Sequence, residues 1–149
     1  MKLPAFLGRI IYFFGYPIFR LLIKNTHRAY VVVQYNNKIL VTKNWLGNQQ
    51  KWRLPGGGIK AGERPAVAAC RELAEEVGVR ISERDLIQLN PTPIEARYGY
   101  LVELFAAPQA KKPKIRIDER EILQATFLSK KELVNEQISD ELQAALRFL

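Results

Sequence analysis

The sequence predicts one domain of the α+β class, or a mixed sheet packed between helices, and three observations point to it. The chain has 149 residues, a length that suits a single hydrophobic core. Hydrophobic residues make up 48% and charged residues 26%, as in folded globular proteins. Strand patterns lie before and after one central amphipathic helix, and a helical pattern ends the chain. A disordered, collagen-like or polytopic membrane protein is excluded, and the single Cys70 excludes an intramolecular disulfide framework.

The first two strands are predicted on either side of a turn at Asn36 and Asn37. Residues Ala29–Tyr35 are rich in β-branched and aromatic side chains. Residues Lys38–Lys43 alternate between apolar and polar, as a returning strand does. Because adjacent asparagines are a turn signal, we expect a β-hairpin.

The central helix is predicted over Pro65–Val77. Apolar residues recur at helical spacing, at Ala66, Cys70, Leu73 and Val77. Pro65 suits the first helical position and Gly78 suits the residue that ends a helix. Arg64 has no side-chain acceptor for the free amides of the first turn, so it is an unusual N-cap.

The second half of the chain is predicted to hold two further strands and two helices. The strands are expected over Arg97–Ala106 and Glu121–Leu128. Ser129 is a good N-cap for a helix over Lys130–Glu136. An apolar stripe predicts the last helix, at Leu142, Ala145, Leu146 and Leu149.

Charge is distributed unevenly along the chain. The net charge is +8, from 23 basic and 15 acidic residues, and no acid precedes Glu63. Ten basic residues lie in residues 1–62, so the remainder has 13 basic and 15 acidic residues and a net charge of −2. Such a one-sided field attracts polyphosphates, nucleic acid or an anionic membrane surface, and the alternative is a solvated surface that serves solubility.

Residues 1–25 are predicted to form an apolar, basic N-terminal helix, separate from a domain over residues 26–149. Residues 3–23 have about the length of a membrane span. Arg9 and Arg20 interrupt the stretch, and basic side chains gather along one stripe of a helix. Three alternatives follow: a helix bound to an anionic membrane surface through residues 1–24, a helix packed on the domain or on a second copy in a homodimer, and a true span. We expect a cytoplasmic protein, held at the inner face of the membrane if the first alternative applies.

Three carboxylates share one face of the central helix. Glu72, Glu75 and Glu76 lie at positions i, i+3 and i+4, where they repel one another. A divalent cation that prefers oxygen ligands, Mg²⁺ or Mn²⁺, would offset this repulsion. The preceding Gly56–Gly58 brings bare backbone close to the same place, and the combination suits a diphosphate. The alternative is a solvated acidic face in which Arg71 pairs with Glu75.

From Gly57 to Val79 the chain resembles the signature of the Nudix hydrolases, G-x5-E-x7-R-E-U-x-E-E-x-G-U, where U is aliphatic. Every specified position is filled, by Gly57, Glu63, Arg71, Glu72, Leu73, Glu75, Glu76, Gly78 and Val79. The resemblance implies an α/β/α fold with a mixed sheet. It also implies hydrolysis of a nucleoside diphosphate linked to another group, by water attack at phosphorus with Mg²⁺ or Mn²⁺.

The resemblance also implies roles for single residues. Metal ligands would be Glu72, Glu75 and Glu76, with the carbonyl of Gly56. A structural ion pair would join Glu63 to Arg71. The general base varies across the family, so it is either a glutamate of the signature, with Glu72 the first candidate, or Glu119 or Glu121 in a later loop.

Substrate contacts are expected beside the glycine segment. Arg53 and Lys51 are candidates to position the distal phosphate. Trp45 would stack on a base or belong partly to the core. Three functions stay open: hydrolysis of a nucleotide or nucleotide-sugar, removal of pyrophosphate from the 5′-triphosphate of RNA, and non-catalytic nucleotide binding by a module recruited to the membrane.

Overall fold

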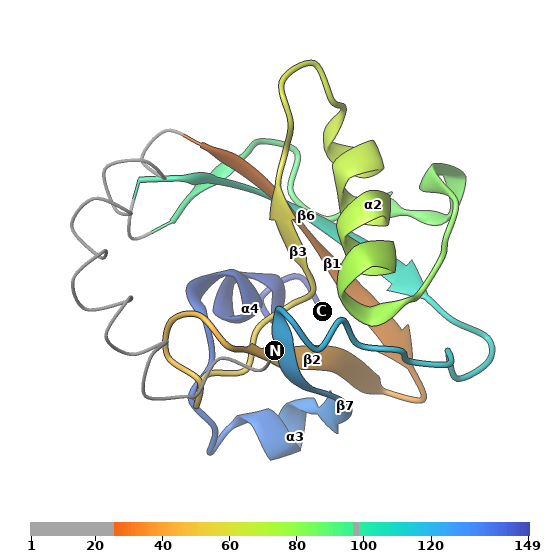
Figure 1. Cartoon of the computed structure of the whole chain (residues 1–149), viewed down its shortest axis with the longest axis vertical. Coiled ribbons are helices and arrows are strands. Elements are labelled where there is room, and N and C mark those ends of the chain that lie inside the picture. The colour runs from red at the N-terminus through yellow and green to blue at the C-terminus, as the bar shows by residue number, and fades with distance from the viewer. Residues whose placement is uncertain (1–25, 97–98) are drawn as a thin grey trace.

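A mixed seven-stranded sheet forms the centre of the computed structural model, which describes residues 26–96 and 99–149 (Figure 1). The predictions for residues 1–25 lie outside the described residues. The main order of strands is β4-β6-β1-β2-β7, with β3 paired to β1 and β5 paired to β6. The strands are β1 (His27–Tyr35), β2 (Lys38–Asn44), β3 (Gly56–Gly58), β4 (Ile87–Gln88), β5 (Ile94–Glu95), β6 (Leu101–Pro108) and β7 (Ile122–Ser129).

The predicted hairpin is confirmed, with β1 and β2 antiparallel on either side of Asn36 and Asn37. Both asparagines have positive φ angles, 47° and 58°. Asparagine tolerates this region, and two positive φ angles give a turn whose twist matches that of the flanking strands. On its other side β1 runs parallel to β6.

Helices cover both faces of the sheet, as the α/β/α expectation requires (Figure 1). Successive side chains of β1 point to opposite faces. Val31 and Val33 pack in one core with helix α2 (Pro65–Val77), while Tyr30 and Val32 belong to the other core. This second core contains Leu133 of α3 (Lys130–Leu133) and Leu142 and Ala145 of α4 (Asp140–Ala145). A 3₁₀ turn, η1 (Glu83–Asp85), follows α2.

Helix α2 has the predicted bounds. It ends at Gly78, whose φ of 71° is left-handed, and Arg64 makes no side-chain cap. Two late carbonyls of the helix are satisfied by a distant segment, because Arg116 N–H donates to Val77 O and Asp118 N–H donates to Glu76 O, each at 2.9 Å. The segment that precedes β7 is thereby docked on the end of α2.

Two predicted bounds in the second half were wrong. Strand β6 begins at Leu101 and not at Arg97, while Arg97 and Tyr98 lie outside the described residues. The capping box of Ser129 and Glu132 starts α3, but the helix ends at Leu133. It ends early because the chain after it pairs with Trp52, whose N–H donates to Gln137 O at 2.8 Å. The predicted last helix is α4, which spans Asp140–Ala145, contains Leu142 and Ala145 of the stripe and has Leu146 as its C-cap.

In the part of the chain that the structure describes, no helix has both the length and the apolar character needed to cross a bilayer.

Candidate active site

The glycine segment forms strand β3, which lies directly on the start of β1. Gly56 pairs with Tyr30, and Gly57 pairs with Ala29. A Cβ atom at Gly56 would overlap the backbone of Ala29 and Tyr30, and the φ of 144° at Gly56 disfavours any other residue. Only glycine lets the two backbones approach this closely, and this approach places β3 under helix α2.

Two carboxylates of α2 lie against this glycine backbone. Glu76 is 5% exposed, and its Oε2 accepts the N–H of Gly56 at 2.9 Å. The carboxylate of Glu72 lies where a side chain of residue 57 would be, because a Cβ at Gly57 would come within 2.7 Å of its Oε2. Gly56, Gly57, Glu72 and Glu76 therefore form one compact group, which we call the glycine–carboxylate site.

Negative charge is concentrated at this site. The pKa of Glu76 is raised to about 8, chiefly by burial. The N–H of Gly56 opposes this rise, and the nearby carboxylates of Glu72, Glu121 and Glu141 contribute to it. The acid from the loop before β7 and the acid from α4 thus act electrostatically on the same carboxyl group. A bound cation would relieve their mutual repulsion.

Arg71 joins the helix to the loop before it. Its Nε donates to Glu63 Oε1 at 2.8 Å, and its Nη2 donates to Gly58 O at 2.9 Å. Its Nη1 donates to Glu72 Oε1 at 2.6 Å, which fixes a carboxylate of the glycine–carboxylate site. The Arg71 guanidinium, helped by the N–H of Lys60, lowers the pKa of Glu63 to about 2.

Glu75 does not join the other two carboxylates. Its side chain is 58% exposed and pairs with Arg71 Nη1 at 3.2 Å. Within residues 26–96 and 99–149, no group of three or more His, Cys, Asp or Glu side chains is arranged to hold a metal ion. The site instead offers two carboxylates, Glu72 and Glu76, beside the backbone of Gly56.

Two carboxylates and one backbone segment are a donor set that suits Mg²⁺, which is seldom enclosed by protein ligands alone. Magnesium usually keeps several waters and is held by one or two carboxylates together with phosphates of the substrate. The space left by the missing Cβ of Gly57 is already taken by the Glu72 carboxylate, so that oxygen ligands converge on the glycine backbone. The residues present therefore fit a divalent cation shared with a diphosphate.

The loop before β7 brings a further acid toward the site. Asp118 N–H binds Glu76 O at 2.9 Å, and Glu121 N–H binds Asp118 O at 3.1 Å. Glu121 is exposed, and its charge acts on Glu76. Trp45 reaches this loop from β2, since its Nε1 donates to Glu119 O at 3.0 Å and its N–H donates to Glu121 O at 3.0 Å.

Arg53 and Lys51 precede the glycine strand. The backbone of Arg53 pairs with that of Thr42: each N–H donates to the carbonyl oxygen of the other residue at 2.9 Å. In the described part of the chain its buried Nε has no hydrogen-bond partner, and its charge acts on Glu141. Lys51 closes a turn by donating its N–H to Asn48 O, and the hydrogen bonds and ion pairs described for the glycine–carboxylate site do not include it.

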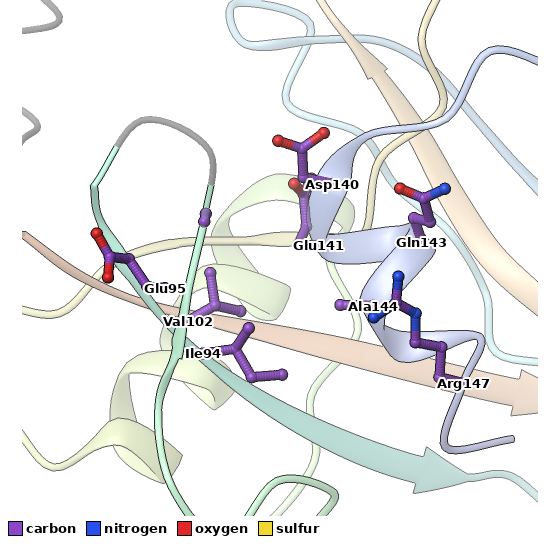
Figure 2. Close-up of a pocket in the computed structure, with 9 residues that line it drawn as sticks. Ile94, Glu95, Val102, Asp140, Glu141, Gln143, Ala144 and Arg147 are labelled. Carbon is purple, nitrogen blue, oxygen red and sulfur yellow. The ribbon is translucent and has the colours of Figure 1, made fainter.

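Sequence reasoning missed Glu141, an acid of α4 that is only 2% exposed. Burial raises its pKa, and the Arg53 guanidinium opposes the shift. It lines a hollow of about 220 Å³ between α4 and the β5–β6 hairpin, where α4 faces Ile94 and Val102 (Figure 2). An acid in the first turn of a helix ordinarily lies at the surface, so the sequence carried no signal for its burial.

Arg28, at the start of β1, is a further basic residue near α4 that the sequence did not indicate. The guanidinium of Arg28 lies 5.1 Å from the centre of the Tyr100 ring, a cation–π contact. Its Nε is a further buried polar atom without a hydrogen-bond partner among the residues that the structure describes. Arg28 and Arg53 thus bring positive charge to the α4 side of the site.

The family profile described as NUDIX domain matches residues 25–147. An RNA pyrophosphohydrolase from Bartonella quintana is 63% identical over the matched segment, which covers 36% of this chain. The match spans only 36% of the length of that relative.

Solved structures share the fold at low sequence identity. A MutT NUDIX hydrolase from Burkholderia pseudomallei superposes with a TM-score of 0.72 and 19% identity, covering 85% of this chain and 98% of that one. A bifunctional NMN adenylyltransferase/ADP ribose pyrophosphatase from Francisella tularensis, complexed with AMP and Mn ion, gives a TM-score of 0.73 and 18% identity, covering 91% of this chain and 45% of that one. The family profile spans most of the chain, and the chain therefore belongs to the Nudix hydrolase family.

Proposed function

We propose that this protein is a pyrophosphohydrolase that depends on Mg²⁺ or Mn²⁺ and cleaves a nucleoside diphosphate linked to another group. One observation carries the proposal. The buried carboxylate of Glu76 is bound to the N–H of Gly56, and the carboxylate of Glu72 lies on Gly57. Two carboxylates beside bare glycine backbone suit a cation that binds both protein oxygens and phosphate oxygens.

Each residue of the site has a proposed task. Glu72, Glu76 and the carbonyl of Gly56 would hold the metal ion, while Glu75 would serve the Arg71 network. When bound, the ion would neutralise phosphate charge and lower the pKa of an attacking water. Glu121 would take the proton from that water, because the loop that carries it is bound to α2 through the hydrogen bond from Asp118 N–H to Glu76 O. Glu72 and Glu119 are the alternative bases.

Positive charge near the site would orient the substrate. Among the described residues, the buried Nε atoms of Arg53 and Arg28 have no hydrogen-bond acceptor, and a substrate phosphate can supply one. Lys51 and Trp45 are weaker candidates for substrate contact, because Lys51 is not part of the hydrogen bonds of the site and the indole N–H of Trp45 is already donated to Glu119 O.

A second, narrower substrate is favoured by the relatives, several of which are named RNA pyrophosphohydrolase. The ten basic residues of the first 62 support an extended polyanion such as triphosphorylated RNA. If RNA is the substrate, the logarithm of KM will rise steeply with the logarithm of salt concentration. For a mononucleotide substrate the same plot will be much flatter.

The test of the proposed function is turnover against a panel of phosphoanhydrides. The panel contains nucleoside triphosphates, ADP-ribose, dinucleoside polyphosphates, nucleotide-sugars and triphosphorylated RNA. We expect cleavage of at least one class with Mg²⁺ or Mn²⁺, loss of cleavage on chelation, and recovery when metal is restored. Nucleotide binding without cleavage of any class would contradict the proposal and favour a binding module.

A further inference from the structure

We propose that Trp45 is a positioning residue, which holds the loop of residues 118–121, and with it Glu121, beside the end of helix α2 that carries Glu76. The inference rests on the proposed function, because it assigns a role in the reaction to Glu121. On this proposal the main role of Trp45 is to hold the loop, and not to stack on a substrate base.

Two hydrogen bonds tie Trp45 to this loop. The indole Nε1 donates to Glu119 O at 3.0 Å, and the backbone N–H donates to Glu121 O at 3.0 Å. The two acceptors flank Arg120, so a single residue holds both sides of the loop tip. The indole is fixed in orientation by its own donor, which limits its freedom to turn toward a ligand.

The irregular pairing of β2 with β7 favours this contact. The register of β2 against β7 shifts between Lys43 and Asn44, directly before Trp45, and Asn44 pairs with Ile122. Such an irregularity redirects the next side chains of a strand. Here it brings Trp45 to the start of β7, where the loop ends.

The opposite side of the loop is fixed to helix α2. Asp118 N–H binds Glu76 O at 2.9 Å, and Ile122 N–H binds Asp118 O at 2.8 Å. The carboxylate of Asp118 also pairs with Arg120 Nη2 at 2.7 Å. Glu121 therefore lies between an anchor on the metal-site helix and an anchor on Trp45, and its charge acts on Glu76.

Removing the indole donor should loosen one anchor and leave the other. Trp45→Phe keeps an aromatic ring and deletes the Nε1–H. Since one hydrogen bond to a backbone carbonyl is lost, we expect kcat to fall about 3- to 10-fold while KM stays unchanged. Trp52→Phe is the matched control, because it deletes an indole N–H that donates to Glu136 Oε2 at 3.2 Å, away from this loop.

The decisive experiment is a double-mutant cycle of Trp45→Phe and Glu121→Gln in the full chain, with the best substrate of the panel. If Trp45 acts through Glu121, Trp45→Phe lowers kcat in the wild-type background and has no further effect in Glu121→Gln. A raised KM at unchanged kcat would make Trp45 a substrate contact and overturn the inference. Multiplying effects of the two substitutions would overturn it as well.

Amide hydrogen exchange supplies a readout that does not need turnover. The Glu121 amide, which is bound to Asp118 O, should exchange faster in Trp45→Phe than in wild type or Trp52→Phe. Unchanged exchange would overturn the inference. If the wild type cleaves nothing in the panel, the proposed function fails by itself, and the exchange rates still decide whether Trp45 holds the loop.

Discussion

Arg71 connects three segments that meet at the site, and it does so with three different donors. It binds Glu63 in the loop before the helix, Gly58 O in β3 and Glu72 in its own helix. A lysine could not replace it, because only a planar guanidinium offers several donors in a fixed fork. The Glu63–Arg71 pair therefore helps to hold the carboxylate of Glu72, the metal ligand proposed above.

This pair predicts a pH dependence of stability. The pKa of Glu63 falls from 4.5 to about 2 in the folded chain, chiefly through Arg71, so folding favours its ionised form. The stability it contributes is fully present above pH 4.5 and is lost as the pH falls toward 2. Denaturant unfolding should show wild type more stable than Glu63→Gln at neutral pH, with the difference vanishing over that acidic range. A constant difference at all pH values would contradict this account.

At the scale of elements, strand β3 is the feature that makes the site. Its neighbouring glycines should respond differently to alanine. The nearest atoms to a Cβ at Gly57 belong to the end of the Glu72 side chain, at 2.7 Å, whereas a Cβ at Gly56 meets backbone at a φ of 144°. Gly57 therefore governs the position of the Glu72 carboxylate, while Gly56 governs the packing of β3 on β1.

We predict that Gly57→Ala changes the free energy of unfolding by less than about 0.5 kcal/mol but lowers kcat/KM about 10- to 100-fold. Gly56→Ala should cost about 2 kcal/mol or more in stability, because strain and backbone overlap combine. Denaturant midpoints and steady-state kinetics on both variants test the contrast. Equal stability of the two variants would show that β3 does not pack on β1 as described.

Elements that depend on interactions between residues close in the sequence were predictable, and those that depend on distant residues were not. Helix α2 and the β1–β2 hairpin were predicted closely, because their stop signals, Gly78 and the Asn36–Asn37 turn, are local. Strand β3 was hidden, because three glycines carry no strand signal and its pairing with β1 is distant. The Trp45–Glu119 bond joins residues 74 apart, and the burial of Glu141 depends on packing across the sheet. No local pattern encodes such contacts.

At the scale of the whole molecule, the charge asymmetry sets an expectation for the N-terminal segment. Ten basic residues precede the first acid, and residues 1–24 contribute four of them, Lys2, Arg9, Arg20 and Lys24. We propose that this segment binds anionic membrane surfaces, each basic residue near the surface contributing about 1 kcal/mol.

Sedimentation with vesicles tests that proposal. The full chain should pellet with anionic vesicles and stay in the supernatant with neutral ones, and Arg9→Glu with Arg20→Glu should reduce pelleting about 10-fold or more. Matched substitutions of Lys111 and Lys112, in the exposed loop after β6, control for net charge. Equal pelleting of the two double variants would contradict a specific role of the N-terminal segment.

The two cores, one on each face of the sheet, place acidic residues from both helical layers near the start of β1. Helix α2 carries the site carboxylates on one face of the sheet, and α4 brings Glu141 from the other, with the start of β1 between them (Figure 1). The strand β3 lies where these layers meet, and it is there that the diphosphate is proposed to bind.

The measurement that tests this account most directly compares Glu76→Gln with Glu75→Gln, the same chemical change at two adjacent positions of α2. Glu76 is 5% exposed and bound to Gly56 N–H, while the side chain of Glu75 is 58% exposed. We predict that Glu76→Gln lowers kcat/KM about 100-fold or more with Mg²⁺ and that Glu75→Gln loses far less. Retained activity in Glu76→Gln, or an equal loss in Glu75→Gln, would contradict a metal site built on Glu72, Glu76 and the glycine backbone.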